Sequence, residues 1–496
     1  MRFLSLQEAL DRLARNVAVK KLRNLLSGRP IESLYVVGGA VRDAFLGRDE
    51  PDLDIVCPAD ELQHLSAFLS ETWPCRLVVL NERWNMVRLV PLCPEKSQKF
   101  VVDLAPARGG PIEDDLLQRD FTVDAMAVRI PPDPQGLLGP LVDPAGGLRD
   151  LASGTIRVMH PDRLAEDPVR LLRAFRIACG LGFAVEPDTL EAIRKTSHLL
   201  SQPAPERIRD ELFKLLGSPG SRPYLDAMDQ AGLVAVLFPE TAALRGLEQG
   251  PEHAREAWSH SMETFRQLEK MMEDDFALLE PCDEVLSEWT TEDGQRAGLL
   301  KLAALLHDIG KPATARSGQD GRVHFFGHDR EGARLCGLIR TRLRISRRSG
   351  ACLERWVRFH LWPLHLYRSS CAHKLGERAK VRFFRRLGLD AFGCLILAAA
   401  DHKAKQNLSK ANEYNENFIQ FIKSMILFSV ERDAAGVRLP PLIRGREIME
   451  RFGLSPGPAI GRLLEKVHEA RAAGEIADRK EALDLVGRLI AEDGIT

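Results

Sequence analysis

Two aspartates separated by one residue, Asp52 and Asp54, could bind a divalent cation. They lie near the end of segment 35–56, YVVGGAVRDAFLGRDEPDLDIV. On an extended strand, residues i and i+2 point to the same face, so the two carboxylates would converge. Convergent carboxylates repel one another unless a cation neutralises them, and such hard oxygen ligands suit Mg²⁺ with phosphate-bearing substrates. The alternative for this pair taken alone is an ordinary surface turn.

A glycine pair, Gly38-Gly39, separates the apolar run from a helical segment. Glycines at a strand-to-helix turn let backbone N–H groups approach phosphate, and a helix start favours an anion. The pair alone is weak evidence, because turns use it constantly. Together with Arg42, Asp43 and the two aspartates at this spacing, it predicts a site for a divalent cation and a phosphate-bearing substrate.

A second set of residues could bind a metal in the other half of the chain. His307 and Asp308 are adjacent in an apolar helical stretch, KLAALLHDIGKP, where an idle polar pair is costly to bury. Imidazole and carboxylate together bind Mg²⁺, Mn²⁺, Ni²⁺ or Fe²⁺, and a bound metal turns water into a phosphate-attacking hydroxide. The further candidate ligands are His260, His328, His360 and Asp401.

Strand signals precede helix signals along the chain. The runs LYVVGG, DLDIVC, RLVVL, NMVRLVPL and FVVDLA, between residues 34 and 130, predict short strands bounded by turns. From about Asp162 onward, apolar residues recur at three- and four-residue spacing, which predicts helices. With 496 residues, the chain is too long for one core, so we expect a multidomain protein, α/β first and all-α afterwards.

The cysteines and the hydropathy pattern indicate a cytoplasmic protein. The nine cysteines include no CxxC pair, and a scattered odd set is typical of free thiols in a reducing compartment. No apolar run reaches the roughly 18 residues of a membrane span, and the first residues lack the features of a signal peptide.

One stretch of the chain is strongly basic although the formal net charge is only −1. Segment 334–386 holds 15 Lys or Arg residues against two acids, Glu354 and Glu377. Such a segment could contact RNA phosphates, and a solvated helical surface is the alternative.

The order of motifs resembles the class II family of bacterial CCA-adding enzymes and poly(A) polymerases, which are polymerase-β-type nucleotidyltransferases. GGAVRDAFLG…DLD is similar to the family's first motif. The order of His260, His307-Asp308, His328, His360 and Asp401 resembles the HD superfamily of metal-dependent phosphohydrolases. The later family motifs are matched by segments 113–128, 143–157, 166–178 and 205–216.

The resemblance implies a polymerase-β-like head with a mixed sheet, followed by helical parts. The implied divisions are the head at 1–160, a nucleotide-selecting neck at 161–240, an HD domain at 241–405 and a tRNA-binding helical tail at 406–496.

The resemblance also implies roles for single residues of the head. Asp167 and Arg170 are three positions apart at an acidic, proline-containing helix start and would read the edge of cytosine or adenine. A capping salt bridge, which Glu166 and Arg170 could also form, is the alternative. The implied sets are Asp52, Asp54 and Asp103 for catalysis and Mg²⁺, and Gly38, Gly39, Arg42, Arg119, Asp120, Asp167, Arg170 and Arg173 for the nucleotide.

The function implied is template-independent addition of C and/or A to the tRNA 3′ end, with CTP and ATP as substrates and two Mg²⁺ ions. The HD domain would hold Mg²⁺ or a divalent transition metal. Gln118 and Asp124 depart from the family's usual arginine and asparagine. Only 16 positions separate Asp103 from Arg119, a short connection that resembles CC-adding specialists.

Three other functions remain open at this point. The first is a poly(A) polymerase. The second is an HD phosphohydrolase whose N-terminal half only binds RNA, and the third is a non-catalytic RNA-binding scaffold. Composition leaves the oligomeric state open, homo-oligomers included.

Overall fold

The computed structural model divides the chain into two compact units. Unit 1 comprises residues 1–215 and 223–237, and unit 2 comprises residues 216–222 and 238–496. The structure describes residues 3–28, 33–49, 52–81, 85–92, 100–131, 138–248, 256–318, 322–405, 411–434, 442–455, 457–472 and 475–493.

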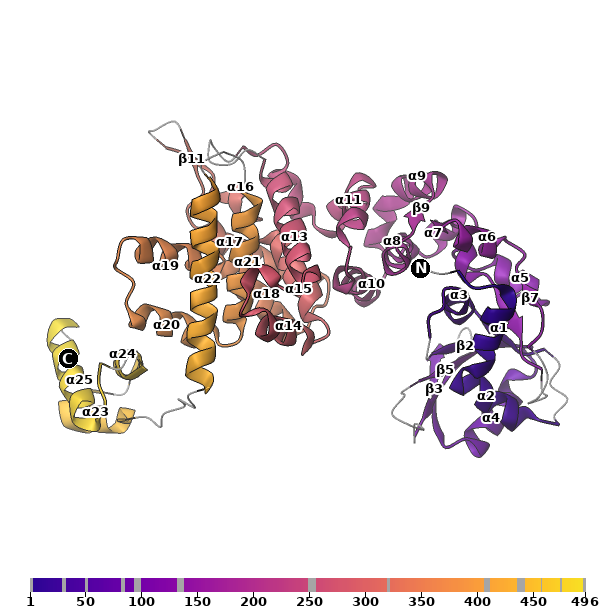
Figure 1. Ribbon diagram of the computed structural model, residues 1–496, viewed down its shortest axis with the longest axis horizontal. Helices are drawn as coiled ribbons and strands as arrows, with labels where there is room; N and C mark the ends of the chain where they lie inside the picture. The colour runs from indigo at the N-terminus through magenta and orange to yellow at the C-terminus, as the bar shows by residue number, and fades with distance from the viewer. Residues whose placement is uncertain are drawn as a thin grey trace. The chain divides into compact units, whose positions relative to one another are not determined.

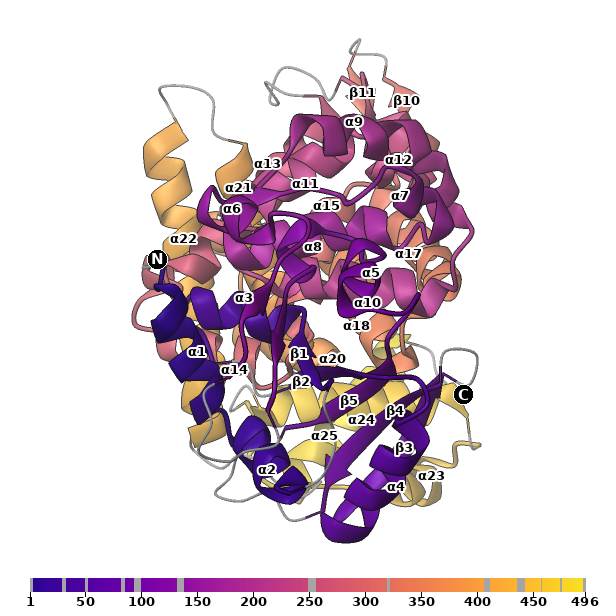
Figure 2. The same cartoon turned by 90° about the vertical axis from the view of Figure 1, so that its right-hand side faces the viewer.

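A seven-stranded mixed sheet forms the centre of unit 1, in the order β3-β4-β5-β2-β1-β6-β7 (Figures 1 and 2). Strands β2 and β5 run parallel, and the other described neighbours run antiparallel. The mixed sheet and all five predicted strands are therefore confirmed. The strands are β1 (Tyr35–Val37), β2 (Leu53–Cys57), β3 (Cys75–Asn81), β4 (Met86–Pro91), β5 (Val102–Pro106), β6 (Ala127–Arg129) and β7 (Leu141–Val142).

Helices cover this sheet, and from Asp162 onward nearly all elements are helices, as the change of apolar spacing predicts. The sheet packs through a small apolar cluster that joins Val37 and Val56 of the strands to Ile112 and Leu116. The helices that begin in the first 237 residues are α1 (Leu6–Arg15), α2 (Val17–Leu26), α3 (Gly39–Phe45), α4 (Leu62–Thr72), α5 (Ile112–Leu117), α6 (Gly147–Ala152), α7 (Asp162–Glu166), α8 (Arg170–Leu181), α9 (Pro187–Thr196), α10 (Pro205–Gly217), α11 (Arg222–Gln230) and α12 (Leu233–Leu237).

Unit 2 is built on helices that pack around α15, whose residues Gly298–Leu306 are all buried. A helix that is apolar on every side belongs in the interior of a bundle. No helix of the described residues is both long and apolar enough to cross a bilayer. The helices of this core are α13 (Ala257–Glu273), α14 (Asp283–Thr291), α15 (Arg296–Leu306), α16 (Lys311–Thr314), α17 (His328–Arg342), α18 (Arg347–Phe359), α19 (Trp362–Cys371), α20 (Glu377–Leu387), α21 (Asp390–Ala404) and α22 (Ala411–Ala434).

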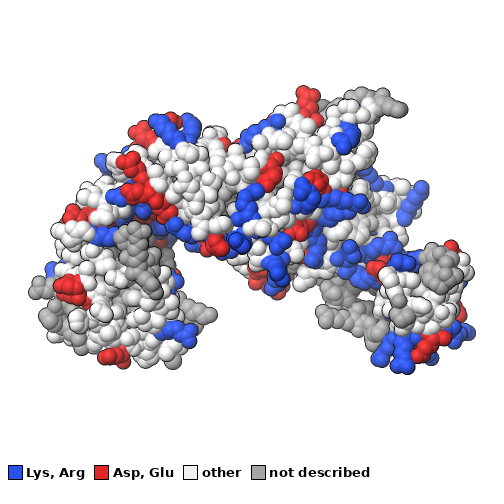
Figure 3. All heavy atoms as spheres, turned by 180° about the vertical axis from the view of Figure 1, so that it is seen from behind, with Lys and Arg blue, Asp and Glu red and all other residues white. Residues whose placement is uncertain are grey.

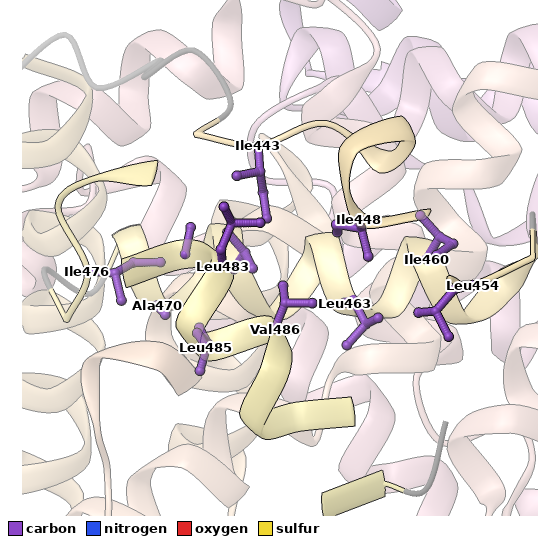
Figure 4. Close-up of a cluster of buried hydrophobic side chains, with 12 residues drawn as sticks. Ile443, Ile448, Leu454, Ile460, Leu463, Ala470, Ile476, Leu483, Leu485 and Val486 are labelled. Carbon is purple, nitrogen blue, oxygen red and sulfur yellow. The ribbon is translucent and has the colours of Figure 1, made fainter. Parts of the chain in front are cut away.

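The last three helices have an apolar cluster of their own (Figure 4). They are α23 (Gly445–Phe452), α24 (Pro458–Ala472) and α25 (Arg479–Asp493). Ile448, Leu463 and Val486 are buried in this cluster, one from each helix. The predicted helical tail thus contains a small helical core.

Much of the basic segment 334–386 is neutralised by carboxylates within unit 2. Arg382 Nη2 lies 3.0 Å from Glu469 Oε2, and Arg342 Nη1 lies 2.7 Å from Glu240 Oε1. Figure 3 shows Asp and Glu among the Lys and Arg side chains of the face that it draws. A charge count along the chain therefore overstates the free positive surface, because the partners come from distant positions.

A buried ion pair fastens segment 216–222 to helices α13 and α15. Lys301 Nζ lies 2.7 Å from Glu269 Oε1, and both side chains are buried. Glu269 also accepts hydrogen bonds from the backbone N–H groups of Ser221 and Arg222, at 2.8 and 3.0 Å. Burial alone would raise the pKa of Glu269, but Lys301, the Ser221 hydroxyl and the Arg222 N–H group lower it. The carboxylate is therefore held in its charged form.

Replacing Lys301 with methionine is expected to destabilise unit 2 by about 3 kcal/mol, because Glu269 would stay buried without its counter-charge. Urea unfolding followed by tryptophan fluorescence measures this loss. The double variant Lys301→Met/Glu269→Gln should lose less, since no unpaired charge remains. Lys270→Met, at an exposed position on α13, is the control. Equal losses in Lys301→Met and Lys270→Met would contradict the prediction.

Candidate active site and candidate metal centre

Unit 1 contains a cavity of about 490 Å³ whose lining is densely charged. Its residues come from the central strands β1, β2 and β5, from segment 108–120 around α5, and from α8 and α10, so strands and helices build it together. The charged residues that line it are Asp54, Asp103, Asp115, Asp120, Asp167, Asp210, Glu211, Arg108, Arg119, Arg170, Arg173, Arg207 and Lys214. Seven residues of the predicted head site are therefore brought together: Asp54, Asp103, Arg119, Asp120, Asp167, Arg170 and Arg173.

Asp54 and Asp103 are direct neighbours on the parallel strands β2 and β5. Arg88 of β4 faces Asp103 and donates two hydrogen bonds of 2.7 Å to it. Desolvation raises the pKa of Asp54, repulsion from Asp103 raises it further, and attraction to Arg119 opposes the rise. A cation between Asp54 and Asp103 would relieve this repulsion. Asp52 precedes the strand, is exposed, and accepts a 2.9 Å hydrogen bond from Val101 N.

Gly38 allows the strand-to-helix turn to pass close to these groups. Its φ is +71°, a left-handed value that side chains rarely adopt. A Cβ atom there would lie 3.1 Å from Arg119 Nη1 and 3.5 Å from Asp54 Oδ2. The glycine therefore serves both the backbone turn and the close approach, and Gly39 then begins α3.

Gly38→Ala is expected to cost about 1–2 kcal/mol of stability for the left-handed backbone and to impair nucleotide addition by displacing Arg119. Gly28→Ala is a matched control, because Gly28 has a φ of +73° and no atom within 4 Å of its Cβ position. Thermal unfolding and primer extension on both variants separate backbone strain from intrusion into the cavity. Equal activity in the two variants would argue that the space beside Gly38 is unimportant.

Arg119 and Arg173 each form an ion pair with an aspartate of the cavity wall. Arg119 Nη2 lies 3.2 Å from Asp115 Oδ2, and Arg173 Nε lies 2.9 Å from Asp120 Oδ2. The attraction of Asp120 raises the pKa of Arg173 against the opposing effect of desolvation. Such paired arginines are fixed in place and keep their charge, which suits binding of an anionic nucleotide.

Asp167 and Arg170 lie between α7 and the start of α8. Arg170 N donates to Asp167 O at 3.0 Å, which supports the predicted helix start. Arg207 of α10 donates two hydrogen bonds to the Asp167 carboxylate, at 3.0 and 2.7 Å. Arg170 Nη1 donates to Arg163 O at 2.8 Å and lies 3.6 Å from Glu166 Oε2, so the alternative salt bridge forms loosely.

The sequence analysis matched segment 205–216, which forms α10, to a family motif but assigned none of its residues to the site. Arg207, Asp210, Glu211 and Lys214 all line the cavity. Their spacing of three, four and seven positions places them on one face of a helix, and this polar stripe was the signal that could have identified them.

In unit 2, the six predicted ligands of the second set converge in two adjoining groups. One group is His260, His307 and Asp401, and the other is Asp308, His328 and His360. Within each group, one ligand atom per residue lies within 4.8 Å of the others, and all six residues are buried. The groups adjoin through His307 and Asp308, whose Nε2 and Oδ2 atoms are 3.1 Å apart.

The backbone orients three of the imidazoles toward the centre of this cluster. The Nδ1 atoms of His307, His328 and His360 lie 2.8, 2.7 and 2.7 Å from the carbonyl oxygens of Ala304, Phe325 and Val357. If each Nδ1–H donates to its carbonyl, each Nε2 is left as a metal-ligating atom.

The hydrogen bonding and most protonation states of the cluster fit a metal, whereas His307, whose pKa Asp308 raises against the effect of burial, would have to give up a proton. His307 Nε2 is buried and makes no hydrogen bond. Burial, and then repulsion from His307 and His328, lowers the pKa of His360 to about 3, so it is neutral at pH 7. The pKa of Asp308 and that of Asp401 lie well below the usual range, because neighbouring cations outweigh burial. Neutral imidazole and ionised carboxylate are the forms that bind metal ions.

Three family models match separate parts of the chain. The Poly A polymerase head domain matches residues 34–157, and the HD domain matches residues 257–363. The probable RNA and SrmB-binding site of polymerase A matches residues 182–244. The head match contains Asp54, Asp103, Arg119 and Asp120, while Asp167, Arg170 and Arg173 lie beyond its end, and the HD match contains every ligand of the cluster except Asp401.

The A-adding tRNA nucleotidyltransferase of Deinococcus radiodurans is 33% identical over 466 residues, which cover 92% of this chain and 95% of that protein. The chain belongs to the bacterial tRNA nucleotidyltransferase family. The CC-adding tRNA nucleotidyltransferase of Thermus thermophilus is another member, 30% identical over 463 residues, or 90% of this chain and 92% of that protein.

The fold agrees with this assignment. A solved structure of the Thermotoga maritima CCA-adding enzyme complexed with tRNA has a TM-score of 0.62 at 21% identity. The match covers 99% of this chain and 100% of that one. The predicted family and fold class are confirmed. The division at residues 160, 240 and 405 and the roles of single residues stay predictions.

One residue expected to bind the triphosphate is engaged elsewhere. Arg42 is absent from the described residues that line the cavity. Its guanidinium donates to Asp124 at 2.6 Å and to Asp43 at 2.9 Å. Burial alone would lower the pKa of Arg42, but Asp124 and Asp43 raise it. Asp124 stands where the tRNA nucleotidyltransferase family usually has asparagine, so this departure gives Arg42 a second charged partner.

Proposed function

We propose that this chain adds C and/or A to the 3′ end of tRNA without a template, using CTP and ATP. The observation that carries the proposal is one cavity that joins the paired carboxylates Asp54 and Asp103 to the Asp167–Arg170 turn. Nucleotidyl transfer needs a metal-binding end and a base-reading end, and the cavity supplies candidates for both. The A-adding and CC-adding relatives support this choice.

In the proposed reaction, Asp52, Asp54 and Asp103 hold two Mg²⁺ ions. Bound there, Mg²⁺ would activate the RNA 3′ hydroxyl and neutralise the triphosphate. Arg88 donates one hydrogen bond to each oxygen of Asp103, and each oxygen keeps a lone pair that could bind a metal ion. Arg119, Asp120 and Arg173 position the nucleotide beside them, and Arg42 with Gly38 and Gly39 supports the turn.

Asp167 and Arg170 choose the base in this proposal. A carboxylate accepts hydrogen bonds and a guanidinium donates them, so the pair can match the mixed edge of cytosine or adenine. Arg207 keeps Asp167 ionised, because its two hydrogen bonds and positive charge lower the pKa of that carboxyl against the effect of burial. An ionised Asp167 acts only as an acceptor, which favours the amino group that both bases carry.

Two observations point to different products. The connection between β5 and α5 is short, which the family resemblance associates with CC-adding specialists. The relative with 33% identity is an A-adding enzyme. We therefore propose addition of C and/or A, and extension of tRNAs with different 3′ ends identifies which of these nucleotides the chain adds.

The test offers three tRNA transcripts, ending at the discriminator base, at C and at CC, each with CTP, ATP or both. Growth of all three to CCA identifies a full CCA-adding enzyme, and growth that stops at CC identifies a CC-adding one. Addition of one A to the CC transcript alone identifies an A-adding enzyme. Long A tails on any RNA would favour the poly(A) polymerase alternative, and absence of extension would overturn the proposal.

A second candidate function rests on the cluster in unit 2. We propose that this cluster holds Mg²⁺ or a divalent transition metal and hydrolyses a phosphoester at an RNA end, such as a 2′,3′-cyclic phosphate. The six buried ligands support this proposal. Incubation of a cyclic-phosphate RNA with Mn²⁺, Ni²⁺ or Mg²⁺ tests it, and an unchanged RNA end with every metal would contradict it.

Three further proposals concern the cellular location, the role of the helical tail and the oligomeric state. A cytoplasmic location fits the eight described cysteines, which are all free, and it fits a tRNA substrate. The helical tail is proposed to hold tRNA, and assembly into a homo-oligomer stays a prediction.

A further inference from the structure

Unit 2 contains a second cavity, of about 450 Å³, apart from the His/Asp cluster. It lies where the end of α14 meets the starts of α15, α18 and α21. The first residues of these three helices, around Arg296, Arg348 and Asp390, line it. Apolar residues complete the wall, among them Leu299, Leu389 and the indoles of Trp289 and Trp356.

Three helix N-termini therefore face one space. The helices have 11, 13 and 15 residues, so each has a substantial positive end. The N-cap residues of α15 and α21, Gln295 and Leu389, provide no side-chain hydrogen bond to the first turn, whereas Ser346 caps α18. Two of the three ends thus have N–H groups without a side-chain cap, and such groups bind anions.

The opposite ends of these helices carry the predicted metal ligands. Arg296 and His307, Ser349 and His360, and Asp390 and Asp401 are each eleven positions apart. At 1.5 Å per residue, the cavity lies roughly 16 Å from the metal cluster. The helices α15, α18 and α21 pack against one another along this length (Figure 1). The cavity is therefore a separate site, on the end of the bundle that attracts anions.

The side chains add positive charge to these dipoles. Arg355 is paired with Asp390 at 2.6 Å, and Arg296 lies 3.2 Å from Glu292 and covers the Trp289 ring. Asp293, also in the wall, accepts a hydrogen bond from Gln295 N. Arg348 has no carboxylate within salt-bridge distance among the described residues and is exposed. Arg348 is therefore the cation available to an incoming anion.

An indole in the wall has an unused donor. Trp289 is 5% exposed, and its Nε1 atom is buried without a hydrogen-bond partner. The neighbouring Trp356 Nε1, by contrast, donates to Asp390 O at 3.0 Å. A buried N–H group without a partner is costly. The Nε1 atom of Trp289 itself has almost no exposed surface, so a ligand acceptor would reach it only after a small shift of the surrounding side chains.

We propose that this cavity binds a nucleotide, with its phosphate at the helix N-termini and Arg348 and its base against Leu299, Leu389 and the indole edges. The volume falls within the range of about 300–1,000 Å³ typical of small-molecule sites. The same chemistry is offered by a free nucleoside monophosphate and by a 5′-phosphorylated nucleotide of an RNA chain. The site does not depend on the proposed transfer reaction.

Titration of the full chain with AMP, CMP, inorganic phosphate and a 5′-phosphorylated RNA tetranucleotide tests the proposal, with tryptophan fluorescence as the signal. The expected result is saturable binding that Arg348→Ala weakens about 10-fold or more, for loss of one charge-assisted contact. Trp289→Phe should weaken binding and remove much of the signal. Arg347→Ala is the control, because Arg347 is exposed on the same turn but does not line the cavity.

Leu389→Glu gives a second variant that leaves the packed core untouched, because Leu389 is 62% exposed. Its carboxylate at the cavity should weaken binding by a similar factor. Binding of AMP and CMP supports a free nucleotide as ligand, and binding of the tetranucleotide alone supports an RNA nucleotide. Binding of inorganic phosphate alone would overturn the nucleotide assignment. Unchanged affinity in both Arg348→Ala and Leu389→Glu would overturn the site itself.

Discussion

Asp54→Asn is expected to reduce nucleotide addition by on the order of 10³-fold or more, because a metal-ion contribution of several kcal/mol is lost. The same change should leave the stability of unit 1 unchanged or slightly higher. The pKa of Asp54 is raised in the folded protein, so its charged form is disfavoured there, and a neutral side chain relieves repulsion from Asp103. Single-turnover extension of a tRNA transcript and thermal unfolding measure the two effects.

A loss of nucleotide addition without a loss of stability would show that Asp54 acts in the reaction and not in maintaining the fold. A residue with only a structural role would lose activity and stability together. Asp60→Asn is the control, because Asp60 is exposed just beyond the other end of β2 and does not line the cavity. Extension by Asp54→Asn at the rate of Asp60→Asn would remove Asp54 from the proposed mechanism.

Asp54 and Asp103 show what local patterns can predict. The alternation of a strand places Asp54 on one face, and the parallel register of β2 and β5 then brings Asp103 beside it. Asp54 could be named from its own strand motif, and Asp103 could be named because the family resemblance places a carboxylate on a neighbouring strand. Arg88, which holds Asp103, could not, because its place on the sheet depends on the antiparallel pairing of β4 with β5.

Most of the contacts that the sequence did not predict join residues that are far apart along the chain. Asp167 meets Arg207 forty positions away, and Arg382 meets Glu469 eighty-seven positions away. Charge counts treat such residues as free, so the basic segment 334–386 looked more exposed than it is. The cavity beside Trp289 was hidden for the same reason, because three helix starts converge there only after the bundle has packed.

The metal ligands of unit 2 were predicted from their order along the chain, and their convergence makes a strong test possible. His307→Gln is expected to lower the affinity for Mn²⁺ or Ni²⁺ by on the order of 10³-fold. Loss of supporting groups around a metal typically costs about 10- to 100-fold, and loss of a direct ligand costs more. Calorimetric titration in the Asp54→Asn background measures this affinity, because the head site is then weakened.

His365→Gln is the matched control, since His365 is exposed on α19 and lies outside both ligand groups. Metal bound to the native chain should also raise its resistance to unfolding, by about 2.7 kcal/mol at a hundredfold excess over Kd. His307→Gln should lose this gain, and His365→Gln should keep it. Equal metal affinity in the two variants would mean that the cluster is not the metal site. Nucleotide addition by His307→Gln alone should match the native rate, because His307 belongs to unit 2 and the transfer cavity lies within unit 1.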